Sequence, residues 1–289
     1  MIVGVVGNPR YADLAAVLRH LSEIAPRLGI SIRAEERLAQ HWPEPVPSLE
    51  GAQLDALVTF GGDGTLLRGA RLLAGAEVPI LGINLGRVGF LTTAGRGDLN
   101  EALSALVERR YAIERRQALA AVVHAPDGTV DAEQRALNDV VVHKGGIARV
   151  VRFNIFIDGE NVGPYSGDGV VVATPTGSTA YSLSAGGPII VPGVEALCVT
   201  PVCAHTLSVR PLVVPATATI VIEPMTEWED DLLVSFDGQT SLHLAMGARI
   251  TVRRAGARVC LVRLGEGGYI QRMRQKLHWG DLSDREGEQ

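Results

Sequence analysis

Short apolar runs alternate with amphipathic stretches along the first third of the chain. Runs typical of buried strands occupy 2–6, 30–33, 56–60 and 78–83, and apolar residues recur at helical spacing in 11–28, 66–73 and 98–109. Glycine-containing connections separate these segments, and Gly29 is a stop signal for the first helix. Alternating strands and helices predict an α/β N-terminal domain over residues 1–110, a parallel sheet flanked by helices.

The pattern changes to closely spaced apolar runs after residue 110. Strand-like segments occupy 118–124, 139–143, 150–157, 170–174, 213–214, 218–223, 232–236, 249–253 and 259–264. Turn signals such as 126–128 and 158–159 separate them. We therefore expect a β-rich, largely antiparallel C-terminal domain over residues 111–265, followed by a C-terminal helix and acidic tail over 266–289.

Composition narrows the class of protein. Of 289 residues, 46% are hydrophobic and 20% charged, so the chain can bury a sizeable core. The net charge of −5 argues against a nucleic-acid or anionic-membrane surface. Three cysteines without a CxxC pair indicate reduced thiols. With no signal peptide and no apolar run of membrane-spanning length, we expect a cytoplasmic protein.

The strand at 56–60 leads into the loop Gly61–Thr65, and a helix follows. Glycines let phosphate oxygens approach the backbone, and the helix presents free N–H groups to them. We expect phosphate to be bound by Gly61, Gly62, Gly64, Thr65 and Arg68. Asp63, the one carboxylate of the loop, suits proton acceptance from an attacking hydroxyl or action through a divalent metal.

The alternative is a purely structural role for this loop, as a tight turn with Asp63 as a helix N-cap. The sequence has neither the third glycine of GxGxxG at the loop nor a GK[ST] string anywhere. An ordinary Rossmann dehydrogenase and a P-loop ATPase are therefore disfavoured.

A second segment, rich in hydroxyl groups and glycine, begins at Ser166 and Asp168 and continues through 174–188. With one aromatic side chain and no charge after Asp168, it suits hydrogen bonding to ribose and amide groups beside a flat ring. A Ser/Thr-rich turn is the structural alternative.

Five strings occur in the order and approximate spacing found in the NAD kinases: Gly61–Thr65, Asn84–Leu91, Asn138-Asp139, Gly177–Tyr181 and Asp237-Gly238-Gln239. A fixed five-residue string recurs by chance on the order of once per million positions. The chain thus resembles the NAD kinase family, most closely over 55–245. The resemblance implies phosphorylation of the 2′-hydroxyl of the adenosine ribose of NAD, giving NADP, with ATP or polyphosphate as donor.

The same resemblance implies roles for individual residues. Asp63 corresponds to the catalytic proton acceptor. The residues implied at NAD are Asp63, Gly64, Arg68, Asn138, Asp139, Arg149, Ser166, Asp168, Thr176, Thr179, Ala180, Tyr181, Ser184 and Gln239. The family usually has Asn-Glu where this chain has Asn138-Asp139. The aspartate side chain is one methylene shorter than glutamate and keeps its charge, which predicts altered hydrogen-bond geometry at the ribose.

A divalent metal ion, Mg²⁺, is also implied, carried by the phosphates, together with assembly into homodimers or homotetramers. The seven histidines show no HxxxH or HExxH spacing, so the sequence itself predicts no protein metal site.

Three other functions stay open. The Gly-Gly-Asp-Gly loop is similar to that of the diacylglycerol and sphingosine kinases, but the polar segment 176–184 disfavours an acyl chain. A non-catalytic NAD-binding sensor would gain nothing from an unpaired Asp63 near phosphates. A metal-dependent phosphatase would use similar parts.

Overall fold

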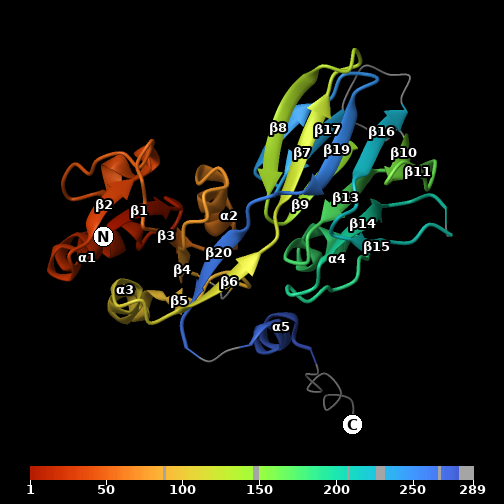
Figure 1. Cartoon of the computed structure of the whole chain (residues 1–289). Helices are drawn as coiled ribbons and strands as arrows, with labels where there is room; N and C mark the ends of the chain where they lie inside the picture. Colours follow the sequence, from red (N-terminus) through yellow and green to blue (C-terminus); the bar gives the residue numbers. More distant parts are fainter. Residues whose placement is uncertain (87–88, 146–149, 207, 226–231, 266–267, 280–289) are drawn as a thin grey trace, which may run out of the picture. The chain divides into compact units, whose positions relative to one another are not determined.

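The computed structural model describes residues 1–86, 89–145, 150–206, 208–225, 232–265 and 268–279 (Figure 1). The chain divides into two compact units. Unit 1 comprises Met1–Arg115 and the described residues from Cys260 onward, and unit 2 comprises the described part of Arg116–Val259. The chain therefore leaves unit 1 once and returns to it.

A sheet of mainly parallel pairs forms unit 1. Its strands are β1 (Ile2–Gly7), β2 (Ser31–Ala34), β3 (Ala56–Gly61), β4 (Ile80–Asn84), β5 (Ala94–Gly95), β6 (Ala112–Arg116) and β20 (Val259–Arg263). They lie in the order β2-β1-β3-β4-β20-β6, with β5 beside β4. The pairs β1–β2, β1–β3, β3–β4, β4–β5 and β4–β20 are parallel. The predicted parallel sheet is confirmed.

Helices cover both faces of this sheet. They are α1 (Leu14–Ile24), α2 (Asp63–Leu72) and α3 (Leu99–Val107), with short 3₁₀ helices at Pro26–Leu28, Glu36–His41 and Arg96–Asp98. Val58 and Phe60 of β3 share a hydrophobic core with α1 and α3, whereas Leu57 and Thr59 face α2. Successive strand residues point to opposite faces, so a strand covered on both sides needs an unbroken apolar run.

The domain boundary differs from the prediction. The run at 259–264 was assigned to the β-rich domain, but β20 pairs with β4 in the parallel sheet, with Leu261 opposite Ile80. Helix α5 (Tyr269–Leu277) also belongs to unit 1. A short apolar run carries no signal for the sheet that it joins when its partner strand is distant in sequence. The acidic tail at 280–289 lies outside the described residues.

Antiparallel sheets make up the described part of unit 2. One contains β7 (Leu119–His124), β8 (Val130–Ala136), β10 (Val151–Ile157), β11 (Glu160–Asn161), β12 (Tyr165–Gly167), β16 (Ile220–Met225) and β19 (Arg249–Arg254). The other contains β9 (Asp139–Lys144), β13 (Gly169–Ala173), β14 (Ala196–Val202), β15 (Leu212–Pro215), β17 (Leu232–Phe236) and β18 (Thr240–His243). Their orders are β11-β10-β16-β19-β7-β8, with β12 on β10, and β15-β14-β13-β9-β17-β18. The predicted antiparallel, β-rich character is confirmed.

The two sheets of unit 2 form a sandwich. Phe153 and Ile222 of the first sheet and Val172 and Val234 of the second are fully buried in one common core. The outer face of the second sheet is covered by the segment after β13, which contains a 3₁₀ turn at Gly177–Thr179 and the short helix α4 (Tyr181–Ser184). The hydroxyl-rich segment singled out in the sequence therefore lies on this sheet.

Strands β8 and β14 were not predicted. In β8, charged and polar residues interrupt the apolar pattern, as is usual for an edge strand. In β14, Pro201 lies in an interior strand, where proline normally argues against strand structure.

Tyr165 connects the two sheets of the sandwich. Its strand β12 pairs with β10 of the first sheet, and its hydroxyl donates to the Gly169 carbonyl oxygen of β13 at 3.1 Å. The ring packs against Phe153, with centroids 5.7 Å apart. Burial raises the pKa of the hydroxyl, so it stays a neutral donor. This bond closes the short corner that contains Ser166 and Asp168.

Replacing Tyr165 with phenylalanine removes the bond but keeps the ring. We expect Tyr165→Phe to lower the free energy of unfolding by about 1 kcal/mol in urea denaturation, the usual net value of a hydrogen bond. As a control, Tyr111→Phe alters a partly buried tyrosine for whose hydroxyl the described structure shows no hydrogen bond. It should change stability by less than about 0.5 kcal/mol. Equal losses in both variants would contradict the assignment.

Candidate active site

Asp63 lies where β3 ends and α2 begins. Its Oδ2 accepts the Phe90 N–H at 2.8 Å, and its Oδ1 accepts the Leu91 N–H at 3.0 Å. Backbone donors fix a carboxylate without placing a full positive charge beside it. The residue is partly exposed, so the remaining lone pairs are accessible to a ligand.

The segment that holds Asp63 approaches so closely that position 89 requires glycine. A Cβ on Gly89 would lie 1.9 Å from Oδ1 of Asp63 and 2.5 Å from its Cγ. Any side chain there would displace either the carboxylate or the donors of Phe90 and Leu91. This close approach explains the glycine in the string Asn84–Leu91.

The loops after β3 and β4 meet at one edge of the sheet. Leu85 donates its N–H to the Gly61 carbonyl oxygen at 3.1 Å, and Oδ1 of Asn84 accepts the Gly86 N–H at 2.9 Å. Ligands of such sheets bind at the carboxyl ends of the strands. The loop that contains Asp63 lies at that edge.

The predicted phosphate residues differ in accessibility. Gly64 is exposed and Gly62 partly exposed at the start of α2. Thr65 is buried, and its hydroxyl lies 2.2 Å from the position that a Cβ on Gly61 would take. Thr65 therefore packs inside the loop, and its contact with phosphate stays a prediction.

Arg68 contacts the end of β1. Its guanidinium donates to Glu35 at 2.7 Å and to the Gly7 carbonyl oxygen at 2.5 Å, and the same Glu35 oxygen accepts the Gly7 N–H at 2.9 Å. Glu35 is only 8% exposed, so the pair is shielded from water. Arg68 thus ties α2 to β1, and the phosphate contact expected for it stays a prediction.

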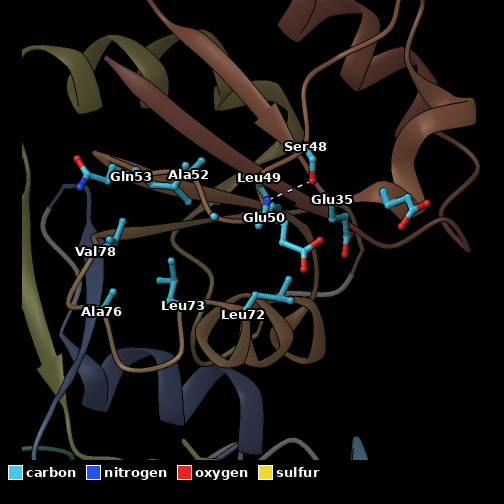
Figure 2. A pocket seen from close by; sticks show the side chains of 13 residues that line it. Glu35, Ser48, Leu49, Glu50, Ala52, Gln53, Leu72, Leu73, Ala76 and Val78 are labelled. Carbon is cyan, nitrogen blue, oxygen red and sulfur yellow. Dashed lines mark hydrogen bonds between the residues drawn. The ribbon is translucent and has the colours of Figure 1, made fainter.

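A separate cavity of about 670 Å³ opens beside the C-terminal end of α2 (Figure 2). Leu72, Leu73 and Val78 line one part of it, and residues 48–54 line another. Glu35, the partner of Arg68, also lines it. Asp63 and the other predicted site residues in the described chain do not, so this cavity is not the site that the sequence predicts.

Residues near the C-terminus support the segment that holds Asp63. Arg263 of β20 donates to the Leu91 carbonyl oxygen at 2.8 Å. The Tyr269 ring of α5 lies 6.3 Å from the Phe90 ring, centroid to centroid. Neither contact was predicted from the sequence, because no local pattern links positions so far apart along the chain.

In unit 2, the pair Asn138-Asp139 opens β9. The Thr174 hydroxyl donates to the Leu137 carbonyl oxygen at 2.6 Å, and the Thr174 N–H donates to the Asn138 carbonyl oxygen at 2.9 Å. Gly177 lies directly on this corner, since a Cβ there would be 2.1 Å from the Asn138 carbonyl oxygen. The hydroxyl-rich segment after β13 is thus packed on the predicted NAD-binding pair.

Asp139 has a buried carboxylate that meets no partner among the residues that the structure describes. The residue is 4% exposed, and within the described structure no hydrogen bond or ion pair reaches its carboxylate. Burial, and next the charge of Asp237, raise its pKa to about 7. Buried polar groups normally have partners, and strongly shifted pKa values cluster at functional sites. Asp139 is therefore suited to meet a ligand.

Two further predicted residues gather near Asp139. The Asp168 carboxylate pairs with Lys144 at 2.6 Å, and the hydrogen bond from Lys144 holds the pKa of Asp168 below its ordinary value. Burial first, and then the nearby Cys203, Asp168 and Asp139, raise the pKa of Tyr181. The electrostatic effects of Asp168 and Asp139 on Tyr181 indicate that these three side chains lie near one another in unit 2.

The remaining predicted NAD residues of unit 2 differ in exposure. Ser184 is exposed, Ser166, Thr179, Ala180 and Gln239 are partly exposed, and Thr176 is buried, with its hydroxyl accepting a bond from Arg116 at 3.1 Å. Arg149 lies outside the described residues. Contact of each with NAD stays a prediction. Within the string 237–239 only Gln239 has a predicted role, whereas Asp237 is the residue that binds the corner at 137–139.

Among the residues that the structure describes, no group of three or more His, Cys, Asp or Glu side chains is arranged to hold a metal ion. None of the helices in those same ranges is long and apolar enough to cross a membrane.

Comparisons with known proteins identify one family over both units. Residues 3–111 match the family model of the ATP-NAD kinase N-terminal domain, and residues 137–264 match that of the ATP-NAD kinase C-terminal domain. The NAD kinase of Gemmatimonas aurantiaca is 45% identical over 288 residues, which cover 100% of this chain and 99% of that protein. The NAD kinase of Acidobacterium capsulatum is 40% identical over 283 residues, covering 96% and 99%.

Solved structures give the same result. The yeast NADH kinase, crystallised with NADH, superposes with a TM-score of 0.87 and 28% identity, over 97% of this chain and 88% of that one. The Archaeoglobus fulgidus NAD kinase, in complex with ATP, gives a TM-score of 0.72 and 26% identity, over 96% and 98%. The chain therefore belongs to the ATP-NAD kinase family, as its sequence strings predict.

Proposed function

We propose that this protein transfers the terminal phosphoryl group of ATP to the 2′-hydroxyl of the adenosine ribose of NAD, giving NADP and ADP. Its family membership and the substrates of the related structures support this activity. The observation that carries the proposal is the Asp63 carboxylate, held by two backbone N–H groups at the carboxyl edge of a parallel sheet.

In this reaction Asp63 accepts the proton of the 2′-hydroxyl. The ribose oxygen forms a bond to the γ-phosphorus of ATP while the bond from that phosphorus to the β,γ-bridging oxygen breaks, and ADP leaves with the electron pair. Asp63 needs a fixed position more than an unusual basicity, because phosphoryl transfer depends mainly on positioning and charge stabilisation. The Phe90 and Leu91 N–H groups supply that position.

Unit 2 contains residues suited to NAD. Asp139 offers a buried carboxylate that has no partner among the described residues, which suits the hydroxyl groups of a ribose. The exposed ring of Tyr181 offers a surface on which a base can stack, and Asp168, fixed by Lys144, offers a further acceptor. These three residues support NAD rather than a lipid as the acceptor substrate.

The residues present fit a divalent metal that arrives with the phosphates. Asp63 is the carboxylate of the phosphate loop, and the described chain holds no larger cluster of metal-binding side chains. Mg²⁺, bound mainly by phosphate oxygens with Asp63 beside it, would supply neutralisation of the phosphate charge.

We also propose a cytoplasmic location and self-association. The three cysteines are free, as is usual in a reducing compartment. Strand β15 is an edge strand whose Leu212 and Val213 are exposed, and apolar edges of this kind pair readily with another copy. A homodimer or homotetramer is the assembly that we expect. Polyphosphate as an alternative donor is a further proposal.

Asp63→Asn removes the proton acceptor with little change in shape. We expect kcat for NADP formation to fall by at least about a thousandfold, while the Kd of NAD measured by calorimetry changes by less than about threefold. The control is Asp98→Asn, an aspartate at the start of α3 whose carboxylate also accepts a backbone N–H, that of Gly95, at 2.9 Å. It should keep wild-type turnover. Loss of NAD binding in step with turnover would contradict the catalytic role.

Asp139→Asn should stabilise the folded protein, and more so at high pH. The folded pKa of Asp139, about 7, lies above the ordinary value of 3.8, so between these values the folded protein keeps a proton that the unfolded chain has released. Stability is therefore lost as pH rises towards 7. We expect the variant's gain in unfolding free energy to be about 2 kcal/mol larger at pH 8 than at pH 5.

Urea denaturation at both pH values measures this gain, and calorimetry measures the accompanying loss of NAD affinity. Asp131→Asn, at an exposed position on β8, is the control and should change the free energy of unfolding by less than about 0.5 kcal/mol. A destabilised Asp139→Asn protein at pH 8 would show that the carboxylate has a structural role rather than a ligand-binding one.

A further inference from the structure

The Asp237 carboxylate receives three consecutive backbone N–H groups. Its Oδ2 accepts the N–H of Leu137 at 2.9 Å, and its Oδ1 accepts those of Asn138 at 2.7 Å and Asp139 at 3.2 Å. The Asp237 N–H in turn donates to the Asp139 carbonyl oxygen at 3.0 Å. One side chain thus determines the backbone shape of the corner that carries the pair Asn138-Asp139.

The turn that contains Asp237 does not by itself require a carboxylate. Asp237 and Gly238 join β17 to β18 with φ of 52° and 60°, and the Gln239 N–H closes the turn on the Phe236 carbonyl oxygen at 3.0 Å. Phe236 pairs with Thr240, so residues 237–239 connect the two strands. Two left-handed central residues in a four-residue turn are typical of type I′, for which Asn-Gly is at least as favourable as Asp-Gly. The negative charge therefore serves something beyond the turn.

The carboxylate also lies next to a second acidic group. Within the described residues, the titratable groups that interact with Asp139 are Asp237 from the β17–β18 turn and Tyr181 from α4. Capping the corner brings this carboxylate close to that of Asp139, which has an energetic cost because like charges repel. The repulsion raises the proton affinity of Asp139 beyond the effect of burial.

We propose that Asp237 is a positioning residue for NAD: its carboxylate holds the backbone of the Asn138-Asp139 corner in the shape that binds the dinucleotide, and it places a second acidic group beside Asp139. This inference rests on the proposed function, in which that corner binds NAD.

The pH dependence follows from the acceptor role of Asp139. The ionised carboxylate accepts hydrogen bonds from ribose hydroxyls with both oxygens, whereas the protonated form loses part of this capacity. The KM for NAD of the wild-type protein should therefore rise as pH falls through about 7, the pKa of Asp139. The KM for ATP should not follow this change.

Asp237→Asn weakens the anchor of the corner and removes the negative charge. Asparagine tolerates the left-handed backbone of the turn but replaces one acceptor oxygen by an N–H donor, so the corner loses part of its anchor. We expect the KM for NAD at pH 8 to rise about tenfold, with kcat and the KM for ATP within about threefold. Without the repulsion, the pH inflection in the KM for NAD should move down by about one unit, and burial keeps it above 4.

The chain offers a matched control. Asp158 precedes Gly159 in another left-handed Asp-Gly turn, with φ of 51° and 87°, and its carboxylate accepts the Thr219 N–H at 2.8 Å. That turn joins β10 to β11 in the other sheet. Asp158→Asn should leave the KM for NAD and the pH inflection unchanged.

Carbon-13 NMR titration of the Asp139 carboxyl group gives a readout that needs no turnover. Its pKa should be lower in Asp237→Asn than in the wild type and unchanged in Asp158→Asn. Failure of the wild-type protein to form NADP would overturn the proposed function, whereas an unmoved Asp139 titration in Asp237→Asn would overturn the role of Asp237. A raised KM with an unmoved inflection would likewise show a merely structural role.

If Asp237→Asn does not fold, Asp237→Glu provides the second test. It keeps the negative charge near Asp139 but extends the carboxylate by one methylene past the three N–H groups. We expect a KM for NAD raised about tenfold with the inflection retained near pH 7. A wild-type KM would overturn the positioning role.

Discussion

Hydrogen bonding of carboxylates by backbone N–H groups is the interaction on which the predicted site residues of each unit depend. Asp63 is held by Phe90 and Leu91, and Asp237 is held by the corner at 137–139. An amide donor fixes a carboxylate in place but, unlike an arginine or lysine, does not neutralise it. Asp63 can therefore be positioned and still accept a proton, and the charge of Asp237 acts on Asp139.

The route of the chain follows from the need to support these donors. Strand β20 returns to the parallel sheet after unit 2, which brings Arg263 to the Leu91 carbonyl oxygen, and α5 places Tyr269 beside the Phe90 ring. The segment at 89–91 is thus held from two sides by residues near the C-terminus. This arrangement gives a physical reason for a domain that is discontinuous in sequence.

Much of the fold and the family membership could be predicted from the sequence, but contacts between residues distant in sequence could not. Continuous apolar runs and glycine loops predicted the parallel sheet flanked by helices, and the ordered strings predicted the family. The prediction placed the run at 259–264 in the β-rich domain, but this run forms β20 of the parallel sheet. The prediction was wrong because a short apolar run fits either domain. The clamp of Arg68 on Glu35 and the anchoring by Asp237 also require the fold, since each joins residues more than thirty positions apart. The string at 237–239 was noticed, yet nothing in it distinguished a turn residue from a positioning residue.

The most direct test of the account is to identify the product. The purified protein would be incubated with ATP, Mg²⁺ and NAD, and the reaction followed by phosphorus-31 NMR. The account predicts one new phosphate monoester on the 2′-oxygen of the adenosine ribose for each ADP formed. Release of inorganic phosphate without NADP would contradict it and would favour a phosphatase-like activity of the same loop.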